Sequence, residues 1–309
     1  MNFYILKRIL YFIPMSFLVV SLSAAMIHFI PGDPVDQIAG DFISEVEKNE
    51  IRKKLGLDKS LFHQILHYCE GVVHGDFGQS LIMGRSVIDL LSERALPSLE
   101  LAVSAVFFSV VISIPLGILS ALQSGKLFDF LCLGSSLIGT SMPNFWLGPL
   151  LVLFFSVHLG WLPVSGRTGL SSIVLPVITL SSSLSAVLIR VTRVNFLEQL
   201  HADYVRTARS KGLSEFKVLF KHTLKNSSIS ILTILSSQFG TLITGTIITE
   251  KVFSWPGLGI LMTEAIERRD YPVVQGCLLV FSFTFLLNSL LTDLLYFWLD
   301  PRIRTGKFS

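Results

Sequence analysis

The sequence is poor in charged residues, and this shortage constrains the protein more than any other feature of its composition. Asp, Glu, Lys and Arg make up 15% of its 309 residues, whereas 51% are hydrophobic. Soluble domains carry about 25% charged residues, so much of this surface is expected to face lipid. The mean hydropathy of +0.64 and the 24 Phe residues indicate the same environment. The composition therefore favours an integral membrane protein.

Other absences exclude further classes of protein. The three cysteines are an odd, scattered set that cannot form a disulfide framework. The basic residues border apolar runs and form no stripe interleaved with exposed aromatics, so nucleic acid is not an expected partner. The chain lacks the G-x-x-x-x-G-K-[ST] phosphate loop, because Gly125-Lys126 has neither the upstream glycine nor the following hydroxyl. We expect no catalytic residue, no resident metal and no bound nucleotide in this chain.

Six apolar stretches approach or exceed the roughly 20 residues that a helix needs to cross the hydrocarbon core. The first follows Lys7 and Arg8, as a cleaved signal would, but its roughly 22 uncharged residues exceed a signal core of about 7–15. An uncleaved anchor is therefore expected. The fold prediction is an all-α integral membrane protein with about six transmembrane helices. The stretches are Ile9–Ile30, Leu99–Leu122, Phe130–His158, Ile173–Ile189, Ile229–Thr249 and Val274–Leu299.

The distribution of Lys and Arg predicts the orientation of these helices. Cytoplasmic loops carry the excess of Lys and Arg in short connections. The N-terminus and the 123–129, 190–228 and 301–309 segments hold most of these residues outside the long 31–98 segment. We therefore expect both termini in the cytoplasm.

The 31–98 segment is expected to form an external helical piece. Pro31-Gly-Asp-Pro34 should end the first helix, because proline cannot continue it. One helix is predicted from Ser44 to Gly56 and another over Leu61–Val73, followed by a turn at Gly75-Asp-Phe-Gly78. The resulting division is an N-terminal helix (1–30), an extracytoplasmic segment (31–98), a five-helix core (99–300) and a cytoplasmic tail (301–309).

His63 and His67 lie four residues apart, a spacing that can place two ligands on one metal ion. No HExxH pattern accompanies them, and an ordinary amphipathic helix explains the same residues. The second interpretation is preferred, and no metal site is predicted.

Prolines inside the predicted spans indicate breaks. Pro143 and Asn144 should interrupt the third span, and Pro115 and Pro176 the second and fourth. Broken helices in a membrane are tolerated where the backbone faces protein or a water-filled path. We therefore predict that the 141–146 segment lines a pore, with helix–helix packing as the alternative. Its candidate residues are Ser141, Pro143, Asn144 and Trp146.

The 190–228 loop is too long for a simple turn between spans. Asp203 to Lys211 reads as a helix ended by Gly212, and Ser214 could cap a second one. That second helix would have an apolar face and another face lined by basic residues spaced four apart. The apolar residues are Phe216, Leu219, Phe220, Thr223 and Leu224; the basic ones are Lys217, Lys221 and Lys225. A lipid surface and a protein partner would both suit this pattern.

A family resemblance favours the protein partner. Asp203-Tyr-Val-Arg-Thr-Ala-Arg-Ser-Lys-Gly-Leu213 resembles the cytoplasmic "EAA" loop of ABC importer permeases. Ala208 and Gly212 match its second alanine and its glycine. Arg206-Thr207 replaces the Glu-Ala of the general pattern, and His222-Thr-Leu-Lys-Asn226 stands where an Ile-Leu-Pro end would be.

Motifs along nearly the whole chain resemble the dipeptide/oligopeptide/nickel branch of these permeases. Each is weak alone, and they occur in the family's order. They are Lys7-Arg-Ile-Leu with Pro14, Pro31-Gly-Asp-Pro34, His74-Gly-Asp-Phe-Gly78, Ser141-Met-Pro-Asn-Phe-Trp146, Phe253-Ser-Trp-Pro-Gly-Leu-Gly259, Arg269-Asp-Tyr-Pro-Val-Val-Gln275 and Leu299-Asp-Pro-Arg-Ile-Arg304.

The resemblance implies a type I permease in a bacterial inner membrane. Its partners would be a second related permease, two ABC ATPase subunits that bind ATP and Mg, an extracytoplasmic solute-binding protein and membrane lipid. The turn after the fifth span would lie at the pore mouth, with Trp255, Pro256 and Gly257 as candidates; an interfacial anchor is the alternative for Trp255. The residues expected to couple to the ATPase are Asp203, Ala208, Arg209, Gly212, Leu213, Lys217 and His222.

The sequence does not decide which of the substrates carried by such relatives this chain transports. Peptides are the preferred class, with dipeptides, oligopeptides and glutathione-like peptides as members, and nickel or a metal chelate is the alternative. A secondary transporter without ATPases is a more distant possibility, since the inverted repeats and paired intramembrane charges of that class are not evident. An inert membrane scaffold or protein-translocation subunit is another.

Overall fold

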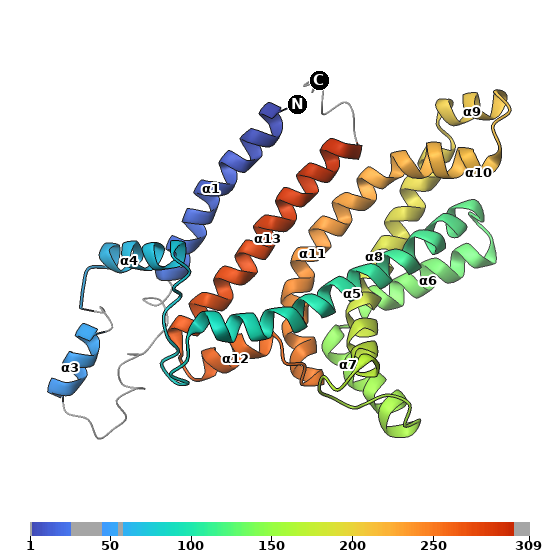
Figure 1. The fold of residues 1–309 in the computed structure, drawn as a ribbon. Coiled ribbons are helices and arrows are strands. Elements are labelled where there is room, and N and C mark those ends of the chain that lie inside the picture. Colours follow the sequence, from blue (N-terminus) through green and yellow to red (C-terminus); the bar gives the residue numbers. More distant parts are fainter. Residues whose placement is uncertain (1, 26–44, 55–57, 300–309) are drawn as a thin grey trace. The chain divides into compact units, whose positions relative to one another are not determined.

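The chain is described by a computed structural model over residues 2–25, 45–54 and 58–299 (Figure 1). These residues are helical apart from loops, turns and one isolated bridge between Gln79 and Ser86. The α-helices are α1 (Asn2–Ala25), α3 (Glu45–Lys54), α4 (Leu61–Val73), α5 (Val87–Leu122), α6 (Leu127–Ser141), α7 (Asn144–Leu151), α8 (Val174–Leu200), α9 (Asp203–Ser210), α10 (Glu215–Lys217), α11 (Lys225–Phe253), α12 (Leu258–Glu267) and α13 (Tyr271–Leu299). Two π-helices, η2 (Val152–His158) and η4 (Val218–Leu224), and a 3₁₀ turn, η3 (Leu170–Ile173), complete the set.

Each of the six predicted spans coincides with helix in its described part. Within the described residues, three helical stretches are long and apolar enough to cross a membrane: Val87–Leu122, Leu170–Leu200 and Tyr271–Trp298. The bent pair α6 and α7–η2 makes a fourth if it counts as one span. The second span extends to Val87, before the predicted Leu99. The expected turn at 31–34, both ends of the 44–56 helix and the 301–309 tail lie outside the described residues.

The prolines have unequal effects on these helices. The predicted break at Pro143 is confirmed, because α6 and α7 meet there at 103°. The predicted breaks at Pro115 and Pro176 are wrong. Pro115 lies inside a continuous α5, which contacts α8 on both sides of it through Ser113 and Gly117. Pro176 lies in the first turn of α8, where the backbone N–H has no helical partner to lose.

The described chain divides into two compact units, and the first comprises Met1–Ser98 and Pro256–Leu290. Its core joins the start of α5 to α12 and the start of α13, through residues such as Leu91, Leu261 and Val274. Helix α4 has the predicted bounds and packs against α1. Buried Gln275 on α13 donates to the carbonyl oxygen of Ser23 on α1 at 3.2 Å. Over the described residues, no group of three or more His, Cys, Asp or Glu could hold a metal ion.

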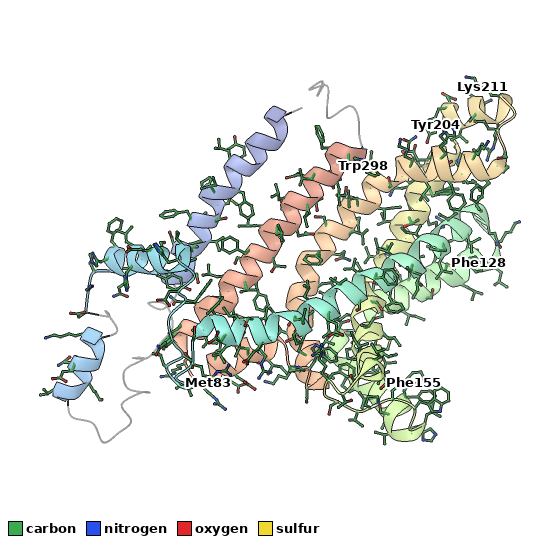
Figure 2. The ribbon with its side chains drawn as sticks, in the orientation of Figure 1. Met83, Phe128, Phe155, Tyr204, Lys211 and Trp298 are labelled. Atoms are coloured by element: carbon green, nitrogen blue, oxygen red, sulfur yellow. The ribbon has the colours of Figure 1, made fainter. Side chains whose placement is uncertain are left out.

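A buried carboxylate in the first unit fixes the loop between α4 and α5. Asp270, 2% exposed, accepts hydrogen bonds from the Ser80 hydroxyl at 2.5 Å and from the Leu81 backbone N–H at 3.1 Å. The Ile82 N–H lies 3.4 Å from its second oxygen, and Ser80 Oγ accepts from the Met83 N–H at 2.8 Å. The loop that carries Met83 (labelled in Figure 2) is therefore tied to the residue before α13.

The second unit comprises Leu99–Trp255 and Leu291–Ser309, and α8 is its central helix. Helix α8 packs against α6, α7 and α11, and Leu180 and Leu188 on it are completely buried. Small residues bring α5 close to α8: the Ser109 hydroxyl donates to the Ser181 carbonyl at 3.3 Å, and a Cβ on Gly117 would lie 2.6 Å from Thr192 Cβ. Small residues allow helix backbones to approach closely in membrane proteins. The second unit is thus built around α8, which leads directly into α9.

Candidate functional site: the 203–224 segment

Helix α9 ends at a backbone turn that only a few residue types accept. It begins at Asp203, whose negative charge suits a helix N-terminus. Gly212 has φ +72° and its N–H donates to the Arg209 carbonyl at 2.9 Å, while the Leu213 N–H donates to the Ala208 carbonyl at 3.3 Å. These two bonds form a Schellman motif, which terminates a helix with a left-handed residue. The predicted helix stop at Gly212 is confirmed.

Helix α9 packs on η4 through a small apolar cluster. Val205 and Val218 are completely buried and Ala208 nearly so, with Tyr204 packed beside them. The Tyr204 hydroxyl donates to Gln199 Oε1 at 2.6 Å, which ties α9 to the end of α8. Figure 2 shows Lys211 at the far tip of this segment, where the chain turns toward α10. The segment is thus a compact helical hairpin at the end of α8.

An ion pair closes the turn between the two arms. The Arg209 Nε atom donates to Glu215 Oε1 at 2.9 Å, and Nη2 lies 3.3 Å from Oε2. Both side chains are substantially exposed, so this pair contributes little to stability. Its two-point geometry restricts how the 211–214 turn can be oriented.

The second arm differs from the prediction. A separate short helix was expected, but α10, η4 and α11 run on without a break. Ser214 occupies the N-cap position without a side-chain capping bond. In η4 the Thr223 hydroxyl donates to the Val218 carbonyl five residues earlier, at 3.1 Å, and both residues are completely buried. A π-turn brings residues five apart onto one face, so the 3.6-residue period did not identify the buried side chains.

Two aromatic rings of this second arm are exposed. Phe216 and Phe220 are 70% and 47% exposed and lie in contact, with ring centroids 4.5 Å apart. The two rings share one face, as the sequence predicted, but Thr223, which the sequence grouped with them, is buried. Exposed aromatic pairs are typical of binding surfaces.

The structure separates the seven candidate coupling residues by exposure. Ala208 is buried against η4 and therefore holds the segment together, whereas His222 is half-buried. The exposed candidates are Asp203, Arg209, Gly212, Leu213 and Lys217. Phe216 and Phe220 were absent from that set, and their aromatic character was the available signal. The assignment of these residues to coupling stays a prediction.

The 141–146 segment forms the break between α6 and α7. The Ser141 hydroxyl donates back to the Leu137 carbonyl at 2.8 Å, and Pro143 occupies the N-cap position of α7. The Asn144 Oδ1 atom is buried and has no hydrogen-bond partner in the described residues. Trp146 is 51% exposed. An open backbone bend with an unpaired polar atom is compatible with a pore lining, which stays a prediction.

The candidate pore-mouth residues are mostly buried within their own units. Trp255 is 1% exposed and lies in the core of the second unit, with the Arg167 guanidinium 5.9 Å from its ring centre. The interfacial-anchor interpretation of Trp255 is therefore wrong, because its ring packs against protein. Gly257 is the N-cap of α12 in the first unit, and Pro256 before it is half-buried. The pore-mouth assignment of this turn stays a prediction.

Comparison with known families gives two matches that together cover most of the chain. Residues 113–305 match the family described as binding-protein-dependent transport system inner membrane component. Residues 1–94 match the N-terminal part of such membrane components. The chain is 42% identical over 301 residues to the glutathione transport system permease protein GsiC of Escherichia coli strain K12. The GsiC protein of Shigella flexneri serotype 5b matches at the same identity, and in both cases 97% of this chain and 98% of the relative are covered.

Solved structures of the inward-facing MetNI methionine ABC transporter also resemble this chain. Two crystal forms match with TM-scores of 0.54 and 0.57, at 17% sequence identity. Each match covers 68% of this chain and 96% of the other. At this identity the likeness concerns the fold.

Proposed function

This chain belongs to the family of binding-protein-dependent transport system inner membrane components, in its dipeptide, oligopeptide and nickel permease branch, and from that premise we propose that it imports peptides. It is a multi-pass inner-membrane permease subunit of an ABC importer, with the type I permease fold. Peptides are the proposed cargo because the GsiC relatives belong to a glutathione transport system, and glutathione is a peptide.

The observation that carries the coupling part of the proposal is the geometry of the 203–224 segment. It is held together by the buried cluster of Val205, Ala208 and Val218, and Phe216 and Phe220 are exposed on it. It connects two long helices, α8 and α11, that pack against each other. A partner that bound this segment and moved would therefore move both helices. That partner is proposed to be an ATPase subunit, which would bind ATP and Mg.

The proposed partners of this chain are three kinds of protein and the membrane lipid. They are a second permease of related sequence, two ABC ATPase subunits, an extracytoplasmic solute-binding protein and the surrounding lipid. The proposed orientation places both termini and the 203–224 segment in the cytoplasm, where Lys211, Lys217 and Lys221 agree with the enrichment of basic residues on that side. The relatives of this chain are permeases, so it is a translocation subunit rather than an enzyme.

In the proposed mechanism, nucleotide shifts the complex between two conformations. ATP binding would draw the ATPases together, and the 203–224 segment would move with them and tilt α8 and α11. The passage would then open outward to receive cargo from the binding protein, and hydrolysis would return it inward. Such coupling requires that nucleotide bind the two conformations with different affinity.

Uptake into proteoliposomes tests the proposal. The four-subunit complex would be reconstituted in vesicles with ATP inside and the binding protein outside. Labelled glutathione, a dipeptide and nickel would be added outside in separate experiments. The expected result is peptide accumulation that requires both ATP and the binding protein. Nickel accumulation without peptide accumulation would support the alternative cargo and contradict the peptide proposal. Uptake without ATPases would indicate a secondary transporter.

A further inference from the structure

An ion pair in the second unit joins the buried Asp129 on α6 to the partly buried Arg193 on α8. Asp129, in the first turn of α6, is 3% exposed. The Arg193 side chain on α8 donates from Nε to Asp129 Oδ1 at 2.5 Å and from Nη2 to Oδ2 at 2.7 Å. Two parallel bonds between guanidinium and carboxylate fix orientation as well as distance. The pair therefore holds one particular arrangement of these helices.

The Asp129 carboxylate also accepts hydrogen bonds from the end of α5 and from the turn that follows it. The Ser120 hydroxyl donates to Oδ1 at 2.5 Å, and the Gly125 backbone N–H donates to Oδ2 at 2.9 Å. The Arg193 Nη2 atom lies 3.3 Å from the Ser124 hydroxyl oxygen. Asp129 thus accepts four hydrogen bonds from three separate parts of the chain. Figure 2 labels the neighbouring Phe128 at this end of α6.

Stability alone is a weak explanation for this arrangement. Removing two charges from water offsets much of their attraction, so a buried ion pair often stabilises no more than apolar side chains of similar volume. What such a pair can supply is a single, defined geometry. Farther along, α6 meets α8 through small residues, where a Cβ on Gly139 would lie 2.9 Å from Ala186 Cβ. The two directional hydrogen bonds at Asp129 add a fixed orientation to this close contact.

The Asp129–Arg193 pair lies between the 203–224 segment and the bend that joins α6 to α7. Arg193 lies near the end of α8, which leads through the 201–202 turn into α9. Asp129 starts α6, whose other end is the 103° bend at Met142–Pro143. We propose that Asp129 and Arg193 are positioning residues that make α6 move with α8 when the 203–224 segment is displaced. This inference rests on the proposed function, because it assumes that an ATPase displaces that segment.

The test measures substrate transported per ATP hydrolysed in the reconstituted complex with its binding protein. Asp129→Asn keeps the shape of the side chain but removes its charge, and Arg193→Lys keeps the charge but cannot form two parallel bonds. Each variant is expected to transport about five- to tenfold less substrate per ATP, within the usual range of coupling between distant sites. The rate of ATP hydrolysis per assembled complex should stay within about twofold of the unsubstituted complex, because neither residue is expected to contact nucleotide.

The matched control breaks a different ion pair, one that lies on the surface. Glu93→Gln breaks the exposed Arg85–Glu93 pair and should leave the ratio of transport to hydrolysis unchanged. The double variant Asp129→Asn/Arg193→Gln leaves no unpaired buried charge and so guards against misfolding; it should still show the lowered ratio. An unchanged ratio in the assembled single or double variants would overturn the inference. Absence of ATP-dependent transport in the unsubstituted complex would instead overturn the proposed function.

Discussion

At the scale of single residues, Gly212 has the strictest backbone requirement in the 203–224 segment. Its φ of +72° is left-handed, yet no atom lies within 4 Å of the position that a Cβ would occupy. Substitution would therefore cause backbone strain and no steric clash. This separation of effects allows a sharp comparison between two side chains.

Gly212→Val is expected to disrupt the end of α9, because a β-branched residue with positive φ costs about 1–3 kcal/mol. Gly212→Asn should be tolerated, since Asn adopts the left-handed conformation readily. The measurement is the amount of ATPase that copurifies with each variant in detergent. The expected order is Gly212, then Asn close behind, then Val severalfold lower. Equal retention by all three would show that this turn does not govern the association.

Asp270 makes a second residue-scale prediction. Asp270→Asn replaces one acceptor oxygen with an NH₂ group that cannot accept from Ser80 or Ile82, so the loop over residues 80–83 should open more often. A lost hydrogen bond to a charged group is worth about 1.5–3 kcal/mol. Hydrogen exchange at the Leu81 and Ile82 amides should accelerate by about 10- to 100-fold. Asp76→Asn, at an exposed turn carboxylate, is the control and should leave these two amides unchanged.

Sequence reasoning succeeded at residues whose role is local. The stop at Gly212 and the break at Pro143 follow from backbone preferences that act within a few residues. Arg193 lies 64 residues from its partner Asp129, and Ser80 lies 190 residues from its partner Asp270. No periodicity within a segment reports such distances, so these contacts required the folded chain. The alternative interpretation of Trp255 as an interfacial anchor was wrong for the same reason, because its burial is a tertiary property.

At the scale of elements, helix periodicity decided what could be predicted. Helix α4 was predicted with its exact bounds, because an amphipathic α-helix has a regular pattern. The run from α10 through η4 includes a π-helix, so its buried side chains, Val218 and Thr223, are five residues apart. A rule built on 3.6 residues per turn grouped Thr223 with the exposed rings, whereas its side chain is buried. The sequence placed Phe216 and Phe220 on one apolar face, and the structure adds that their rings are in contact and exposed.

Replacement of the exposed pair tests its role directly. Phe216→Ser/Phe220→Ser should reduce ATPase association by about tenfold or more, because removing a binding anchor commonly costs more than 1 kcal/mol per residue. The folded permease should remain, since both rings are outside the core. Val218→Ser, at a completely buried site one turn away, should instead lower thermal stability. Full ATPase binding by the double variant would exclude the aromatic pair from the interface.

The α5–α8 contact gives a prediction about packing. Gly117→Leu would place side-chain atoms where Thr192 and the Ile189 carbonyl already lie, and overpacking typically destabilises by about 1–3 kcal/mol. Thermal unfolding in detergent should therefore begin several degrees lower. Gly134→Leu on α6 is the control, because nothing lies within 4 Å of a Cβ there. Similar melting temperatures for both variants would contradict the close α5–α8 contact.

At the scale of the whole molecule, composition and apolar run lengths were sufficient to predict a helical membrane protein. They could not indicate how the helices associate, because apolar side chains facing lipid and apolar side chains facing protein look alike in sequence. Helix α8 illustrates the point: it was predicted as the shortest span, yet it is the helix around which the second unit is built. Its small and polar residues are buried contacts with α5 and α6.

The central claim is that the 203–224 segment binds an ATPase subunit in the cytoplasm. A photoreactive amino acid placed at Phe216 tests it most directly in the complete complex, with the same amino acid at Trp161 as the control. Trp161 is comparably exposed but lies in the loop between η2 and η3, which the proposed orientation places outside. We predict a covalent adduct with the ATPase from position 216 and none from position 161. An adduct from 161, or none from 216 in a complex that retains its ATPases, would contradict the account.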